Sequence, residues 1–320
     1  MVGAVEGFHV PVLLRESLAY LVPPSPDCLM VDATQGLAGH STAFLEKYPG
    51  LRVLGVDADP EMQAMAKARL APYEGRTSFV HAFFDEFFKE FRGVKERPGL
   101  ILFDFGVSMY HFREAKRGFS MQGDEALDMR LDPSTGRTAS DLVNELDARE
   151  LARILAEYGE EPFARSIADT IVRERNAAPI ESAKRLAELI KSSVPPKMRY
   201  GRVHPATRSF QALRIAVNDE LGRISRAIED AIECLAPGGI LGAISFHSLE
   251  DRIVKLAFRE RAVKPVRDKY RNGPAAPIPQ IEGKRGIIVL TKKPVEPAED
   301  EVAANPASRS AKLRVAKAAY

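Results

Sequence analysis

The residues with the clearest capacity for chemistry lie in a stretch that begins at Asp32 and ends at Ser41. Asp32 closes a short apolar run, and Gly36 and Gly39 follow it in a tight turn. A segment of helical character comes next. An apolar strand, a glycine-containing turn and a helix together form a geometry in which backbone N–H groups approach a nucleotide-like ligand.

A second acid, Asp57, ends the next apolar segment, residues 52–56. In nucleotide-binding folds, an acid about 20 residues after the glycine turn, at the end of the second strand, commonly holds a ribose diol. Asp57 is therefore the candidate ribose ligand.

The glycine pattern limits what that ligand can be. Dinucleotide sites use three glycines to bring the backbone near a pyrophosphate, whereas this turn has two glycines and carries Asp32 beside them. A carboxylate there would repel a pyrophosphate but suits a cationic ligand without phosphate, such as S-adenosylmethionine. This stretch alone leaves open another nucleotide, as well as a purely structural strand, turn and helix. A dehydrogenase is the more distant alternative.

Two further strand ends add to the site. Residues 77–82 lead into Phe84, which could pack against an adenine or belong to the core, and residues 100–103 lead into Asp104. Alternating strands and helices predict an α/β fold with a parallel sheet, whose carboxyl edge would gather Asp32, Asp57, Phe84 and Asp104. At that edge, the Asp104 carboxylate could accept the N–H of an exocyclic amine and orient its lone pair toward a methyl donor.

The pattern changes after residue 110. Residues 111–204 show little strand character but four helical segments, at 139–144, 148–158, 162–176 and 182–193. This predicts a helical domain inserted between the two parts of the sheet domain, residues 1–110 and 205–320. Loops around Arg117 and Arg130 are candidate site walls.

Beyond the insertion we expect one long helix from residue 204 to about residue 235. Strands are expected at 240–246 and 287–291. His247, at the end of the first of these strands, is a candidate for base recognition. The tail, residues 305–315, has the small and basic composition of a surface or RNA-facing segment.

Charge is unevenly distributed although the net charge is only +2. Between residues 173 and 214 there are ten Lys/Arg residues and three acids, a local net charge of +7. Between residues 264 and 293 there are eight Lys/Arg residues and two acids, a local net charge of +6. Two such runs favour a polyanionic partner. Cys28 and Cys234 lie far apart, as expected of buried thiols in a reducing compartment. No secretory signal and no membrane-spanning apolar run are evident, so we expect a cytoplasmic protein.

Other chemistries fit poorly. The sequence has neither the G-x-S-x-G turn of serine hydrolases nor a Walker A lysine, and no His, Cys or carboxylate spacing predicts a metal site.

In sequence order, a set of motifs resembles the small-subunit ribosomal RNA cytosine-N4 methyltransferases, the RsmH/MraW family. The similarity covers nearly the whole chain. The motifs that carry it are residues 9–14, 32–41, 57–60, 104–108, 117–120, 127–133, 204–214 and 245–252, with the tail 305–314.

The resemblance implies a class I, Rossmann-like methyltransferase sheet with an inserted helical domain, and S-adenosyl-L-methionine as donor. The acceptor it implies is the N4 amine of a cytosine in the decoding region of 16S rRNA, so the partner is the small ribosomal subunit and not a membrane. It also admits a homodimer. The donor contacts that it implies are Ala38, Gly39, His40, Asp57, Phe84, Asp104 and His111, with Asp104 as the catalytic residue.

The chain departs from the family pattern at two places. Ala38 replaces a glycine, which is tolerable if its φ is negative, and His111 stands where a glutamine usually contacts the donor. Two alternatives follow: a methyltransferase that acts on a DNA or protein amine, and a non-enzymatic RNA-binding assembly factor with a donor-like pocket.

Overall fold

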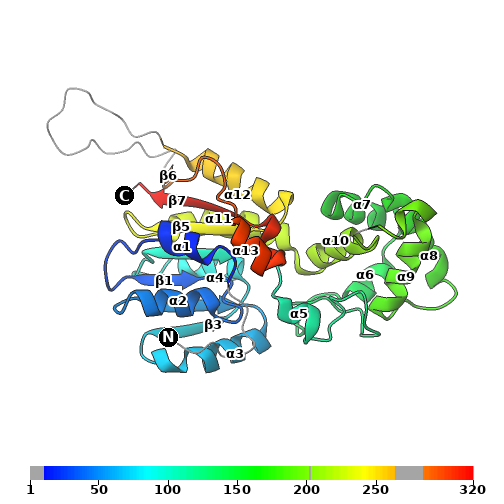
Figure 1. The fold of residues 1–320 in the computed structure, drawn as a ribbon, viewed down its shortest axis with the longest axis horizontal. Helices are drawn as coiled ribbons and strands as arrows, with labels where there is room; N and C mark the ends of the chain where they lie inside the picture. Colours follow the sequence, from blue (N-terminus) through cyan, green and yellow to red (C-terminus); the bar gives the residue numbers. More distant parts are fainter. Residues whose placement is uncertain (1–10, 202, 264–283, 320) are drawn as a thin grey trace. The chain divides into compact units, whose positions relative to one another are not determined.

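A computed structural model describes residues 11–201, 203–263 and 284–319 (Figure 1). Residues 9 and 10 of the first family motif and most of the basic run 264–293 lie outside the described residues. None of the helices in those ranges is both long and apolar enough to cross a membrane. The chain divides into two compact units, one of residues 1–106 with 222–320 and one of residues 107–221.

The first unit is built on a seven-stranded sheet with the strand order β3-β2-β1-β4-β5-β7-β6 (Figure 1). The strands from β1 to β5 pair in parallel, and β7 runs antiparallel to both of its neighbours. The expected Rossmann-like α/β sheet is therefore confirmed. The strands are β1 (Leu29–Asp32), β2 (Arg52–Asp57), β3 (Thr77–His81), β4 (Leu100–Asp104), β5 (Ile240–Ser245), β6 (Ile287–Val289) and β7 (Lys312–Ala318).

Helices cover both faces of this sheet, and the central strands are apolar on both sides as a result. Along β4, Leu100 and Leu102 face one apolar cluster, whereas Ile101 and Phe103 face the other, as the two-residue period of a strand requires. The helices of this unit are α1 (Leu14–Tyr20), α2 (Gly39–Lys47), α3 (Pro60–Leu70), α4 (Phe84–Phe91), α11 (Glu220–Cys234), α12 (Ser248–Arg261) and α13 (Glu299–Ala304).

The tail prediction was wrong in part. The end of the segment expected to be a surface tail belongs to β7, which lies between β5 and β6. Its basic composition hid an alternation with buried Leu313 and Val315. Arg314, which is 7% exposed, donates two hydrogen bonds to the Asp251 carboxylate, at 2.6 and 2.9 Å. Arg314 is therefore buried and paired with an acid, whereas the basic composition of the segment predicted exposure to solvent.

The long helix expected from residue 204 to 235 is two helices. α10 (Thr207–Asn218) ends where Asp219 adopts a left-handed conformation, with φ of 48°, and α11 starts at Glu220. Aspartate is one of the few residues besides glycine that adopt this conformation at modest cost. The apolar spacing continues across the break, so periodicity alone could not reveal it.

The second unit is helical. Four of its helices, α6 (Ala139–Glu145), α7 (Ala148–Gly159), α8 (Ala164–Arg175) and α9 (Ala183–Ser193), match the expected segments to within two residues. Side chains of Thr138, Asp147 and Ser182 cap α6, α7 and α9. The unit also contains α5 (Met109–Arg113) and α10.

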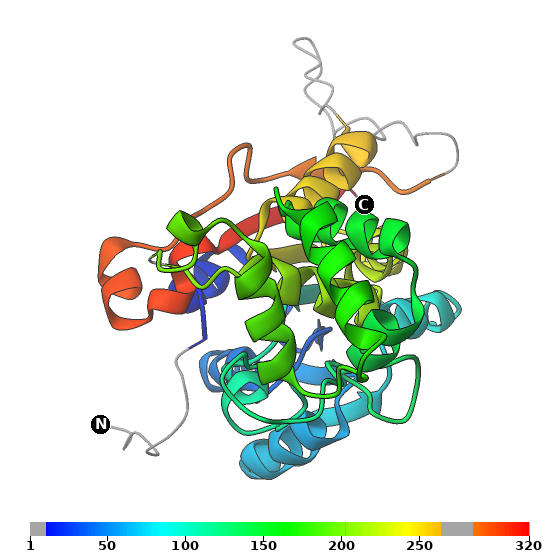
Figure 2. The same cartoon turned by 90° about the vertical axis from the view of Figure 1, so that its right-hand side faces the viewer.

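α7 packs against both α8 and α10 (Figures 1 and 2). Gly159 at the end of α7 allows the close approach to α10, because a Cβ there would lie 2.5 Å from the Arg208 carbonyl oxygen. α10 therefore belongs to the helical unit, which reaches residue 221 rather than residue 204.

Candidate active site

The turn between β1 and α2 has an unusual backbone. Gly36 and Ala38 both lie in the left-handed region, with φ of 51° and 58°. The negative φ that would make the loss of a glycine at this position tolerable is therefore not found, and Ala38 holds a conformation that costs an L-residue about 1–2 kcal/mol. Gly39 is required for a different reason, since a Cβ would come within 2.5 Å of the Pro11 ring.

Asp57 organises the same turn from the end of β2. Its Oδ2 accepts a hydrogen bond of 2.7 Å from the Gly36 N–H, and its Oδ1 accepts one of 2.8 Å from the Asp59 N–H. The position predicted for a ribose ligand is thus held rigidly at the edge of the turn.

Asp32 has a supporting place. It is 2% exposed, and its Oδ2 accepts a hydrogen bond of 2.6 Å from the Ser41 hydroxyl in the first turn of α2. Burial raises the pKa of Asp32 to about 6, while the Ser41 hydrogen bond opposes that rise. This acid fastens the start of α2 to the end of β1.

Asp104 lies at the end of β4, next to β1 in the sheet. Its backbone N–H donates to the Thr34 hydroxyl at 2.6 Å, which ties it to the turn. Its side chain is 26% exposed, yet the Oδ1 atom is buried and has no hydrogen-bond partner among the described residues. Burial, with the nearby charges of Asp32 and Glu250, raises the pKa of Asp104 to about 8.

His40 is expected to contact a donor, but its ring forms a hydrogen bond within the protein. It is 5% exposed, and Nε2 lies 3.1 Å from the Val12 carbonyl oxygen, so Nε2 carries the hydrogen. Nδ1 is then an unprotonated acceptor, 3.7 Å from Oδ2 of Asp104. Burial lowers the pKa of His40 to about 4, which keeps the ring neutral. The backbone N–H groups in the first turn of α2 remain the part of this segment that suits a ligand.

Phe84 begins α4 and belongs to an aromatic cluster. Its ring centroid lies 5.7 Å from that of Phe103 and 5.9 Å from that of Phe105. The next residue, Asp85, is 7% exposed and accepts hydrogen bonds from Arg223 and Arg226. Phe84 can therefore supply an aromatic wall for an adenine, whereas the neighbouring Asp85 is engaged by two arginines.

His111 belongs to the helical unit. It lies on α5, is 5% exposed, and its ring packs 5.2 Å from that of Phe119. The other predicted donor contacts all lie in the sheet unit. In the helical unit, Arg117 donates to the carbonyls of Arg130 and Leu131, so it supports its loop from within.

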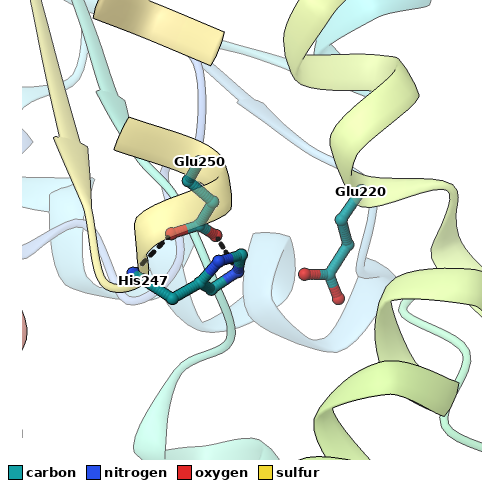
Figure 3. A group of neighbouring side chains, drawn as sticks. All are labelled: Glu220, His247 and Glu250. Carbon is teal, nitrogen blue, oxygen red and sulfur yellow. Dashed lines mark hydrogen bonds and ion pairs between the residues drawn. The ribbon is translucent and has the colours of Figure 1, made fainter. Parts of the chain in front are cut away.

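Sequence reasoning missed Glu250, the partner of His247 (Figure 3). Glu250 is fully buried, and its Oε2 accepts the N–H groups of Phe246 at 2.7 Å and His247 at 3.2 Å. The His247 ring Nε2 lies 3.2 Å from Oε1 of the same carboxylate. The sequence feature that could have revealed Glu250 is an acid in the first turn of a helix that follows a strand, which is the usual position of a capping glutamate.

Comparison with known proteins gives consistent matches over nearly the whole chain. The model of the MraW methylase family matches residues 6–319. A ribosomal RNA small subunit methyltransferase H from Treponema denticola is 47% identical over 313 residues, covering 98% of each chain. The proteins of that name from Heliobacterium modesticaldum and Treponema pallidum are 43% and 41% identical, covering 97% and 96% of this chain and 98% and 92% of theirs.

Proposed function

This chain belongs to the MraW methylase family, and from that premise we propose that it methylates the exocyclic N4 amine of a cytosine in the decoding region of 16S rRNA. It is an S-adenosyl-L-methionine-dependent methyltransferase of small-subunit ribosomal RNA. Because its relatives are named for ribosomal RNA, we propose that the protein acts in the cytoplasm.

The residues at the carboxyl edge of the sheet fit this donor. Asp57 would hold the ribose diol, and the backbone of Ala38, Gly39 and His40 would face the rest of the donor at the start of α2. Phe84 would form an apolar wall for the adenine. His111 is proposed as a further contact from the helical unit, in place of the family's glutamine.

The observation that carries the proposal is the unpartnered, buried Oδ1 atom of Asp104. A buried acceptor without a donor is costly, so its retention at the strand edge points to a ligand that brings an N–H group. An exocyclic amine has such hydrogens. By accepting one of them, Asp104 would turn the nitrogen lone pair toward the methyl group.

The donor supplies an activated methyl group. The nitrogen lone pair forms the new N–C bond, the C–S bond breaks, and its electron pair stays on sulfur. The nitrogen then carries an excess proton, which the Asp104 carboxylate is placed to accept. The Nδ1 atom of His40 is an acceptor beside that carboxyl group. After the transfer it can accept a hydrogen bond from the protonated Asp104.

The test is product identification. The protein is incubated with labelled S-adenosyl-L-methionine and small ribosomal subunits that lack base methylation, and the RNA is digested to nucleosides. Labelled N4-methylcytidine is expected. Label on DNA or protein amines alone, or donor binding without turnover, would instead support the alternative acceptors or an assembly factor. Light scattering of the purified protein tests for the homodimer.

A further inference from the structure

The helical unit exposes one aromatic side chain far more than any other large apolar residue in the described ranges. Tyr200, between α9 and α10, is 84% exposed. Met198 and Val203 beside it are 48% and 64% exposed. An exposed apolar group of this kind gains nothing from burial within its own chain, so the cluster suits a binding surface.

A lysine lies against this aromatic ring, in a basic part of the sequence. The Lys191 ammonium lies over the Tyr200 ring, 4.7 Å from its centroid. Within the described ranges neither Lys191 nor Lys197 forms an ion pair with an acid. From residue 189 to 218 the sequence has no Asp or Glu. The Lys and Arg residues in that span are Lys191, Lys197, Arg199, Arg202, Arg208 and Arg214.

The segment is held in place although its aromatic side chain is exposed. Arg199 donates from Nε to the Val194 carbonyl at 3.0 Å and from Nη2 to the Ser192 carbonyl at 2.8 Å, at the end of α9. His204 accepts the Ala206 N–H through Nδ1 at 3.2 Å, at the start of α10. Burial lowers the pKa of His204, and Lys191 lowers it further, so this ring stays neutral beside the lysine.

From these contacts we propose that Tyr200 stacks on an unpaired base of the RNA substrate, while Lys191 and Lys197 contact its phosphates. The proposal rests on the proposed function, because it takes RNA as the substrate. Bases offer an aromatic face only where they are not paired within a duplex. A ring next to cations, in a span without acids, matches the stacking platforms of proteins that bind single strands.

Fluorescence provides a direct test, because the chain has no tryptophan. The Y200W variant therefore places a single tryptophan at the proposed platform, and the V94W variant, at an exposed position between α4 and β4 and outside the cluster, serves as the control. Titration with a single-stranded RNA of the small-subunit target region should quench Y200W saturably and V94W much less. Equal quenching in both variants, or none in Y200W, would overturn the stacking proposal.

Substitutions that keep or remove the ring complete the test. Stacking on an aromatic side chain is worth enough that Y200A should weaken single-stranded RNA binding by about 5- to 100-fold, whereas Y200F should stay near wild type. Donor affinity should not change in either variant. If Y200A loses affinity for the assembled subunit but not for free RNA, the surface binds a protein and the proposal fails. If wild type binds RNA through Tyr200 but transfers no methyl group, the proposed function fails and the platform stands.

Discussion

The Nδ1 atom of His40 faces the Oδ2 atom of Asp104 across 3.7 Å, and the other ring nitrogen of His40 is bound to the Val12 carbonyl. Both facing atoms are hydrogen-bond acceptors when Asp104 is ionised. A proton on Asp104 removes this conflict, in agreement with its raised pKa. The pair thus couples the protonation of the proposed catalytic aspartate to the tautomer of a buried histidine.

His40 should therefore act as a positioning residue. The H40Q variant keeps an amide near the Nε2 position, and H40N places one near Nδ1, so the two variants separate the two contacts. We expect kcat to fall about tenfold in both, with H40Q closer to wild type in thermal stability because it can still donate to Val12. Donor affinity and melting temperature distinguish this from direct donor binding, which would appear mainly as weaker donor affinity.

Removing the Asp104 charge should lower the activity of the protein without unfolding it. We expect D104N to lower kcat by about 100-fold or more, the range for loss of a positioned acid or base, with the fold retained.

The pH dependence follows from the raised pKa of Asp104. Its folded-state pKa lies above the ordinary value of 3.8 that it has in the unfolded chain, so the stability linked to its proton is complete below pH 3.8 and is lost as the pH rises toward about 8. Denaturant unfolding should show D104N gaining stability relative to wild type as the pH rises. A constant difference between the two from pH 4 to pH 9 would show that Asp104 does not have a raised pKa.

Activity should follow the opposite trend. Only the ionised Asp104 carboxylate can take up the proton that the amine nitrogen loses, so kcat/KM should increase as the pH rises through its pKa. A profile that is flat in this range, measured with saturating donor, would contradict the role given to this carboxylate.

Ala38 should be replaceable by glycine with a gain in stability. The left-handed φ of 58° is unfavourable for alanine and free of strain for glycine. After allowance for the greater flexibility of unfolded glycine, A38G should stabilise the protein by about 0.5–1 kcal/mol. The control is A64G, at an exposed position inside α3, which should cost about 1 kcal/mol. Both values come from urea unfolding, and similar losses in the two variants would refute the strained turn.

Asn218 should hold the loop that carries Arg130. Its Oδ1 accepts the Leu131 N–H and its Nδ2 donates to the Met129 carbonyl, each at 2.8 Å, and it is 5% exposed. N218A should destabilise the helical unit by about 2–3 kcal/mol, since two buried backbone groups lose their partners. N218D keeps the acceptor but not the donor, so its stability should lie between those of wild type and N218A. Hydrogen exchange of the backbone amides of residues 128–132 measures the loss of stability in this loop. Unchanged protection of these amides in N218A would contradict the role of Asn218.

The strand-end residues could be predicted from the sequence because two physical rules converge there. Buried parallel strands are continuous apolar runs, and their carboxyl ends share one edge. Asp57 and Asp104 follow from those rules without knowledge of distant contacts. The four helices of the insertion follow equally well, since their caps and apolar periods are local.

The features that escaped prediction depend on contacts between distant parts of the chain. The strand β7 was hidden because Arg314 is neutralised by Asp251, which is 63 residues away. The ring of His40 binds Val12, 28 residues away, a contact that the family resemblance, which implied a donor contact at His40, could not reveal. The φ of Ala38 is imposed by the turn around it, and no side-chain preference of alanine reveals a left-handed conformation.

The most direct test of the account is the identity of the methylated nucleoside made by wild type and by D104N under the same conditions. Unmethylated small subunits, labelled donor and each protein are incubated, and the RNA nucleosides are separated, with donor affinity measured in parallel by calorimetry. The account predicts labelled N4-methylcytidine with wild type and at least a 100-fold slower appearance with D104N, which should still bind donor. Label in any other nucleoside, or equal rates for the two proteins, would contradict it.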